Sequence, residues 1–145
     1  MNPRFIECLG DDCGKLDALL AERIYEFNSA AIGRHDGKLF GYAMRSHLGQ
    51  VVAGISGHTW AGFCCISYLW VTEPLRDEGI GRDLVQKVEA QAARRGCSMV
   101  FVSTHSFQSP KFYERLGYER QATIHDHPVG HANHIYAKRL TRPGA

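Results

Sequence analysis

The chain has 145 residues, of which 44% are hydrophobic and 22% are charged, and its formal net charge is +2. This length suits one domain with a substantial core, so we expect a single domain over residues 1–145. A nearly balanced charge argues against a dedicated nucleic-acid-binding protein, which usually carries a strongly basic surface. The sequence has no apolar run long enough to span a membrane and no signal-peptide segment, which favours a cytoplasmic protein without a membrane partner.

The cysteines favour reduced thiols. Their number, five, is odd, and no C-x-x-C pair occurs. Cys64 and Cys65 are adjacent, so their side chains would point to opposite faces of a strand. We therefore expect neither a disulfide framework nor a zinc site.

The first half of the chain predicts a helix and several strands. Residues 1–9 contain a short stretch, RFIEC, that is compatible with a strand. Apolar residues at helical spacing then predict a helix over 13–30. Short glycine-containing turns separate the next three segments, which predicts antiparallel strands at 39–46, 49–60 and 63–73. The last of these is almost continuously apolar, so we expect it in the middle of the sheet.

The second half begins with a predicted helix in the stretch 74–96, and Gly96 is typical of the residue after a helix end. The remaining expected elements are a buried strand at 98–104, a helix that Ser109 caps and Gly117 ends, and strands at 118–124 and 134–140. A strand, a helix and a strand at this spacing form a crossover with parallel strands. The expected fold is α/β, a mixed sheet with central antiparallel strands, one parallel pair and helices on both faces.

The turn with Arg76, Gly79 and Gly81, in the segment PLRDEGIG, allows three interpretations. A dinucleotide-binding fingerprint would need a third glycine where Leu84 stands, and the P-loop motif is absent. A plain strand-to-helix turn explains the glycines without any ligand. A phosphate site explains them too, because glycine lets the backbone approach a phosphate, and a helix start offers free N–H groups at its positive end.

This segment resembles a known signature. RDEGIG matches the R/Q-x-x-G-x-G/A motif of the GNAT superfamily of acetyl-coenzyme A-dependent N-acetyltransferases, and FYERLGYE is similar to its second hallmark. The resemblance covers residues 67–119, and the tail DHPVGHANHIYAKRL resembles a group of small bacterial members. It implies acetyl transfer from acetyl-coenzyme A to an amine, and a sheet whose parallel strands are splayed apart.

The resemblance implies a cofactor site built mainly from backbone. The backbone of Leu69 and Val71 would pair with the pantetheine arm, and the Leu69 N–H would donate to the thioester oxyanion. Arg76 would stand at the mouth of the pyrophosphate site, and the N–H groups of the next turn would hold the pyrophosphate: those of Asp77, Glu78, Gly79, Ile80, Gly81 and Arg82. Ser106 stands where many members carry an asparagine that contacts the cofactor, and Phe112 belongs to the second motif.

Tyr113 corresponds to the superfamily's tyrosine near the coenzyme sulfur, where a phenol can protonate or hydrogen-bond the leaving thiolate. A plain packing role on the inner helix face is the alternative. Several groups are candidates for the base that takes the amine proton. Some members use a strand glutamate, but Cys65 stands in that place. His105 is the first replacement, Glu73 and Glu26 are weaker ones, and water is another.

Four histidines lie within ten residues near the end of the chain: His125, His127, His131 and His134. Their spacing matches no zinc signature and no cysteine is nearby, so we expect no metal. We expect this loop to shape the acceptor pocket or a subunit contact, with His131 the first residue to test.

Three functions remain open at this point. The leading hypothesis is direct acetyl transfer, in a ternary complex, to a primary amine of a small molecule. The alternatives are acetylation of a protein or peptide amine, and a non-catalytic sensor that binds coenzyme A. A closed aromatic pocket using Tyr25, Trp60 or Tyr68 would favour a small molecule, whereas a shallow acidic groove would favour a peptide. The superfamily also implies a possible homodimer.

Overall fold

The computed structural model describes residues 2–141, and the chain forms two compact units that divide between His35 and Asp36. The first unit contains helix α1 (Asp11–Ile32), which confirms the helix predicted over 13–30. Two aspartates in its first turn face the positive end of the helix dipole, and Gly33 ends it in the left-handed conformation.

The strand expected within residues 1–9 is wrong. Residues 2–9 have no regular structure. A strand persists only where a neighbouring strand accepts its backbone hydrogen bonds, and the sheet begins with a later segment. An apolar stretch as short as RFIEC does not specify a partner.

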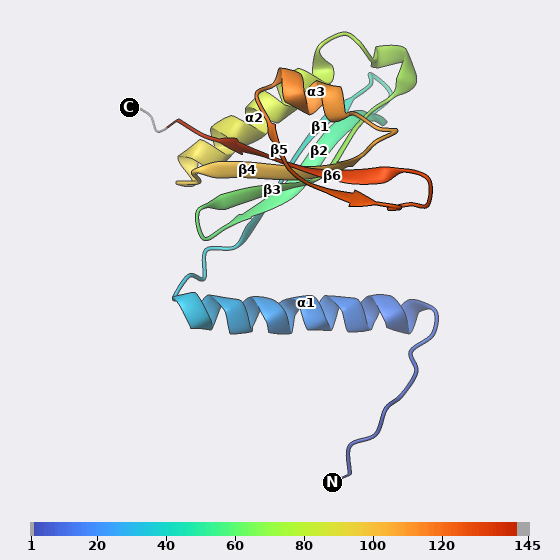
Figure 1. The fold of residues 1–145 in the computed structure, drawn as a ribbon, viewed down its shortest axis with the longest axis vertical. Coiled ribbons are helices and arrows are strands. Elements are labelled where there is room, and N and C mark those ends of the chain that lie inside the picture. The colour runs from blue at the N-terminus through green and yellow to red at the C-terminus, as the bar shows by residue number, and fades with distance from the viewer. Residues whose placement is uncertain (1, 142–145) are drawn as a thin grey trace. The chain divides into compact units, whose positions relative to one another are not determined.

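The second unit contains a six-stranded sheet in the order β1-β2-β3-β4-β6-β5 (Figure 1). The strands are β1 (Lys38–Arg45), β2 (Val51–Trp60), β3 (Phe63–Val71), β4 (Met99–His105), β5 (Glu119–His125) and β6 (Ala132–Arg139). Every neighbouring pair is antiparallel except β3 and β4, which are parallel. The mixed α/β sheet with one parallel pair is therefore confirmed, and β3 lies in its interior as its apolar sequence predicts.

The parallel pair is joined by a short 3-10 helix, η1 (Glu73–Leu75), and by helix α2 (Ile80–Arg94). Gly96 has a φ of 79° and follows the end of α2, as predicted. Helix α3 (Pro110–Arg115) follows β4. Ser109 precedes α3, but its side chain makes no cap; instead its N–H donates to Thr104 Oγ1 over 3.2 Å. Among the helices of the described residues, none is both long and apolar enough to cross a membrane.

Helices α2 and α3 cover the same face of the sheet (Figure 1). Val85 and Val88 of α2 are fully buried, and Glu89 of α2 forms a 2.8 Å ion pair with Lys138 of β6. Tyr113 of α3 stacks on Tyr136, which lies two residues before Lys138 in β6. Residues two apart in a strand point to the same face, so both helices pack on one side of this unit. This packing fixes where α2 starts relative to the ends of β3 and β4.

Buried thiol and phenol groups, Cys64 and Tyr113 among them, make the fold sensitive to alkali. Burial raises the pKa of the Cys64 thiol from 9.0 to about 12, and the pKa of the Tyr113 phenol from 10.0 to about 12. Both groups therefore stay neutral in the folded protein at pH values where they ionise in the unfolded chain. Their contribution to stability is complete below their unfolded pKa values and is lost as the pH rises towards 12.

We predict that the free energy of unfolding falls above about pH 9, by up to about 1.4 kcal/mol per pH unit for each ionising group. Urea denaturation measured between about pH 8 and pH 11 checks this directly. A Cys64→Val variant lacks one of these titrating groups, so its stability should fall less steeply. An identical slope in the variant would show that Cys64 is not responsible.

Candidate active site

β3 and β4 separate along part of their length. Their parallel pairing ends with Ile66 opposite Val102. Within the described residues, the pairing does not resume, although β3 continues to Val71 and β4 to His105. Beyond the split, β3 stays paired with β2, and β4 stays paired with β6. The sheet is thus open along one seam, between two strands that are each supported from the other side.

A bulge in β3 accompanies this opening. Ser56 of β2 pairs with Tyr68, but the next residue, Gly57, pairs with Ile66, which leaves Ser67 as an extra residue in β3. An extra residue increases the local twist and reverses which side chains face each side of the sheet. β3 therefore turns away from β4 just where the parallel pairing ends.

The backbone of the open part of β3 has a defined direction. The Thr72 N–H donates to the carbonyl of Val52 in β2 over 2.9 Å. Because backbone groups alternate along a strand, Trp70 also faces β2, whereas Leu69 and Val71 direct their N–H and C=O groups into the opening. The structure thus places both predicted backbone positions at the seam.

The turn after β3 is tied to the strand end by Arg76, whose Nε donates to the Val71 carbonyl over 2.9 Å. Asp77 and Gly79 both have left-handed backbone conformations, with φ values of 63° and 83°. Alternating left- and right-handed residues turn successive N–H groups towards one side and form a concave anion site. Glycine is the residue that adopts this conformation without strain, which explains Gly79.

The start of α2 lacks a side-chain cap, so the N–H groups of its first turn are available. A Cβ on Gly79 would lie 2.7 Å from Nη2 of Arg82, which shows that this guanidinium folds back over the helix start. Asp83 lies 3.5 Å from the same guanidinium. An arginine at the positive end of a helix is unfavourable unless anions compensate for it, so this geometry suits a phosphate-bearing ligand.

Helix α3 packs against the first turn of α2. A Cβ on Gly81 would lie only 3.3 Å from Cζ of Phe112, so the missing side chain lets the two helices approach closely. The ring of Phe112 meets the ring of Tyr113 edge-on, with centroids 5.0 Å apart. Tyr113 is 4% exposed and also contacts Tyr118, with centroids 5.6 Å apart. Its raised pKa keeps its phenol protonated, as a hydrogen-bond donor.

His105 ends β4, on the other strand of the seam. Its Nδ1 lies 2.9 Å from the carbonyl oxygen of His127, in the loop between β5 and β6. Its backbone N–H donates to Oε1 of Gln108 over 2.8 Å, and its ring stacks on Phe107 with centroids 5.3 Å apart. The ring is therefore held by a hydrogen bond and a stacking contact, and the backbone beside it is held by Gln108.

The other groups considered as bases lie on β3, η1 and α1. Burial raises the pKa of Cys65, so its thiol is not a base at neutral pH. Glu73 opens η1, and Glu26 lies in α1, 3.6 Å from Arg23. Ser106, the predicted cofactor contact, accepts the Ala132 N–H at its hydroxyl over 3.0 Å. Its hydroxyl hydrogen remains able to donate, but the residue also anchors the loop before β6.

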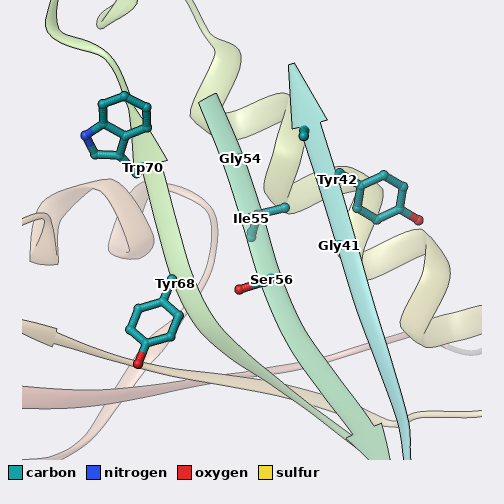
Figure 2. Close-up of a pocket in the computed structure, with 8 residues that line it drawn as sticks. Gly41, Tyr42, Gly54, Ile55, Ser56, Tyr68 and Trp70 are labelled. Atoms are coloured by element: carbon teal, nitrogen blue, oxygen red, sulfur yellow. The ribbon is translucent and has the colours of Figure 1, made fainter. Parts of the chain in front are cut away.

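A pocket of about 350 Å³ lies on β1, β2 and β3, where Tyr68 and Trp70 stand two residues apart on β3 (Figure 2). Its floor is made of small residues in two rows that follow the strand register. In one row, Gly41 pairs with Ser56, which pairs with Tyr68. In the other row, Ala43 pairs with Gly54, which pairs with Trp70. The two aromatic rings are 78% and 51% exposed. The lining residues, Tyr42 and Ile55 included, carry no acidic side chain.

Of the aromatic residues predicted for an acceptor pocket, Tyr68 lines this one. Trp60 lines a different hollow of about 230 Å³ beside Arg95, and Tyr25 lies in α1. Trp70 was missed, although the strand pattern offered a signal, since Tyr68 and Trp70 are two residues apart and so share a face.

The four histidines near the end of the chain do not share one site, and His125 ends β5. His134 is buried in β6, where its Nδ1 lies 2.9 Å from the Thr123 hydroxyl. The rings of His127 and His131 pack instead against His105 and Phe107 respectively. In the part of the chain that the structure describes, no three His, Cys, Asp or Glu side chains gather in a way that could hold a metal ion.

These features agree with the comparisons with known proteins. A model of the acetyltransferase (GNAT) family matches residues 5–118. The chain is 37% identical over 93 residues to a blasticidin-S acetyltransferase of Streptomyces morookaense, covering 63% of this chain and 68% of that protein. It is 28% identical over 105 residues to an acetyltransferase of Agrobacterium fabrum, covering 72% and 77%.

A crystal structure of an acetyltransferase from Bacillus cereus superimposes with a TM-score of 0.77 at 26% identity, covering 94% of this chain and 98% of that one. Since the family model spans well over half of the residues, the chain belongs to the GNAT acetyltransferase family. It is an acetyltransferase, as its two sequence motifs predict.

Proposed function

We propose that this protein transfers the acetyl group of acetyl-coenzyme A directly to a primary amine of a small molecule, within a ternary complex. The observation that carries the proposal is the open seam between β3 and β4, which leads to the uncapped start of α2. The seam offers strand-like backbone, and the start of α2 offers N–H groups for phosphates.

In this proposal, the backbone of Leu69 and Val71 pairs with the pantetheine arm as an added strand would. The N–H groups of residues 77–82 hold the pyrophosphate, and Arg76 and Arg82 supply positive charge beside it. The side chains of Asp77 and Glu78 contribute nothing favourable to an anion, so their role is confined to the backbone. Phe112 supports the phosphate turn by packing over Gly81.

The transfer itself needs an oxyanion donor and a partner for the leaving thiolate. The Leu69 N–H points into the seam and donates to the thioester oxygen as negative charge develops there. Tyr113 donates a hydrogen bond to the sulfur. Its pKa of about 12 lies well above the value of about 8.5 typical of a thiol, so complete proton transfer to the thiolate is uphill. Tyr113 therefore stabilises the thiolate by hydrogen bonding.

The pocket of Tyr68 and Trp70 supports a small-molecule acceptor. Two exposed aromatic rings above a floor of small residues can stack on a flat ring or attract a cationic amine. A basic peptide would be better served by acidic side chains, and none lines this pocket. The relative from Streptomyces morookaense acts, by its name, on the small molecule blasticidin S.

The proposal is tested by measuring thiol release from acetyl-coenzyme A with a panel of small amines and, separately, of lysine-containing and N-terminal peptides. Rapid release with small amines alone supports it. Release with peptides alone identifies a peptide acetyltransferase instead. Tight binding of acetyl-coenzyme A without release by any amine identifies the non-catalytic sensor.

Replacing Trp70 by alanine should raise the KM of the acceptor by about 5- to 30-fold, because removing one aromatic contact costs about 1–2 kcal/mol. Steady-state kinetics with varied acceptor measures this, and the Kd of acetyl-coenzyme A should change less than about twofold. The matched control is Trp60→Ala, which removes the other tryptophan from a separate hollow. Equal effects of the two variants on the acceptor KM would refute the assignment of the pocket.

A further inference from the structure

We infer that His105 is the general base of this acetyltransferase, and that the loop between β5 and β6 fixes the ring nitrogen with which it acts. This inference rests on the proposed function. It also gives a role to the histidine-rich segment, whose residues do not form a metal site among the described side chains.

The hydrogen bond to the loop determines the tautomer of His105. A carbonyl oxygen only accepts, so the 2.9 Å contact between Nδ1 and the His127 carbonyl requires the proton on Nδ1. In the neutral ring, the lone pair then lies on Nε2. Stacking on Phe107 and the bond from the His105 backbone to Gln108 restrict the position of the ring further.

His105 lies near the level of Leu69 along the seam. It lies three residues beyond Val102, and Leu69 lies three residues beyond Ile66, the last pair that joins β3 to β4. Because Ser67 is the extra residue of the bulge, Leu69 is about two register steps, or roughly 7 Å, beyond the point of separation, and His105 is about 10 Å beyond it. A thioester whose oxygen meets the Leu69 N–H is consequently flanked by the end of β4, which carries His105.

His105 also lies on the correct face. Val102 and Thr104 are buried beneath the helices, so alternation directs His105 to the opposite face of the sheet. After the bulge, Tyr68 and Trp70 lie on that same opposite face, whereas Tyr113 lies on the helix face. The amine and His105 thus approach the acyl carbon from one face of the sheet. The leaving sulfur and Tyr113 lie on the opposite face.

The proton balance is complete without any further reactant. Nε2 of His105 takes one proton from the bound ammonium, and the freed amine attacks the carbonyl carbon and forms the C–N bond. The C–S bond breaks, and the thiolate leaves with a hydrogen bond from Tyr113. The second N–H proton of the attacking nitrogen ends on the thiol, and the His105 proton passes to water.

Among the described residues, few titratable or polar groups lie near the His105 ring. The His127 ring meets it edge-on with centroids 5.6 Å apart, and His131 contacts the adjacent Phe107. Asp126, in the same loop, accepts the Gly130 N–H at its carboxylate. Asn133 is the register partner of His105 on β6 and is uncharged.

The test compares the pH dependence of kcat/KM in the wild type and in His105→Gln, with two acceptors whose amines have different pKa values. In the wild type, the rising limb should have the same midpoint for both acceptors, because it reports the enzyme base. In His105→Gln, kcat/KM should fall by about 100-fold near pH 7, and the midpoint should follow the pKa of each acceptor. A wild-type midpoint that follows the acceptor, or an unchanged profile in the variant, overturns the inference.

His127→Ala is the matched control, since it removes the ring but keeps the backbone carbonyl. The pH profile of His127→Ala should keep the wild-type midpoint. A midpoint that shifts as it does in His105→Gln would show that the His127 ring, and not its backbone carbonyl, is what His105 needs to act as the base. Ring nitrogen NMR of the wild type should show unprotonated Nε2 in neutral His105; a proton on Nε2 overturns the assignment independently of activity. If the wild type acetylates no amine, the proposed function itself fails instead.

Discussion

Replacing Gly79 by valine is expected to weaken the binding of coenzyme A by about 10- to 100-fold, with the fold intact. Gly79 has a φ of 83°, a conformation that a β-branched residue avoids at a cost of about 1–3 kcal/mol. The turn relieves this strain by moving its N–H groups out of the arrangement that faces a phosphate. A Cβ would also displace the Arg82 guanidinium, which lies 2.7 Å from its position.

Gly79→Asn separates backbone strain from simple bulk, because asparagine tolerates the left-handed conformation far better than valine. It should therefore retain more of the affinity than Gly79→Val. Calorimetric titration with coenzyme A measures the Kd, and thermal unfolding confirms that each variant is folded. A folded Gly79→Val protein that binds coenzyme A as the wild type does would rule out the phosphate site at this turn.

Removing the hydroxyl of Tyr113 is expected to lower kcat by about 10- to 150-fold, since a hydrogen bond to a charged group contributes about 1.5–3 kcal/mol. The thiolate develops its charge only as the C–S bond breaks, so the lost bond acts on the transition state. Tyr113→Phe should accordingly leave the KM of acetyl-coenzyme A within about threefold of the wild type.

Tyr118→Phe is the control for this change. Tyr118 is also buried, and its ring centroid lies 5.6 Å from that of Tyr113. Like Tyr113→Phe, the Tyr118→Phe variant loses one phenol hydroxyl from the same cluster of rings. Equal losses of kcat in the two variants would indicate a packing effect, and an unchanged kcat in Tyr113→Phe would remove its role at the sulfur.

Most of the second unit could be predicted from sequence, because local patterns determine it. The apolar face of α2, the positive-φ glycine after its end and the almost continuous apolar run of β3 each reflect a requirement within one segment. The left-handed turn before α2 was predictable for the same reason. The proposed phosphate site depends on backbone conformation over a few consecutive residues, and RDEGIG encodes that conformation.

The features that the sequence did not predict depend on contacts between segments that are distant in the chain. Whether RFIEC forms a strand depends on a partner that the segment itself does not specify. The bulge at Ser67 depends on the register between β2 and β3, so the sequence pattern did not show that Tyr68 and Trp70 share a face with His105. The bond from His105 to the His127 carbonyl joins residues 22 positions apart through backbone, which no side-chain motif reports.

The central claim is that the seam between β3 and β4 holds the acetyl-coenzyme A thioester, and a crystal structure of the complex with acetyl-coenzyme A tests it most directly. The predicted result is a pyrophosphate on the N–H groups of residues 77–82, and a thioester oxygen about 2.7–3.1 Å from the Leu69 nitrogen. The phenol of Tyr113 should lie on the helix side of the sulfur. Density for the pantetheine arm outside the seam, or a pyrophosphate away from the start of α2, would contradict the account.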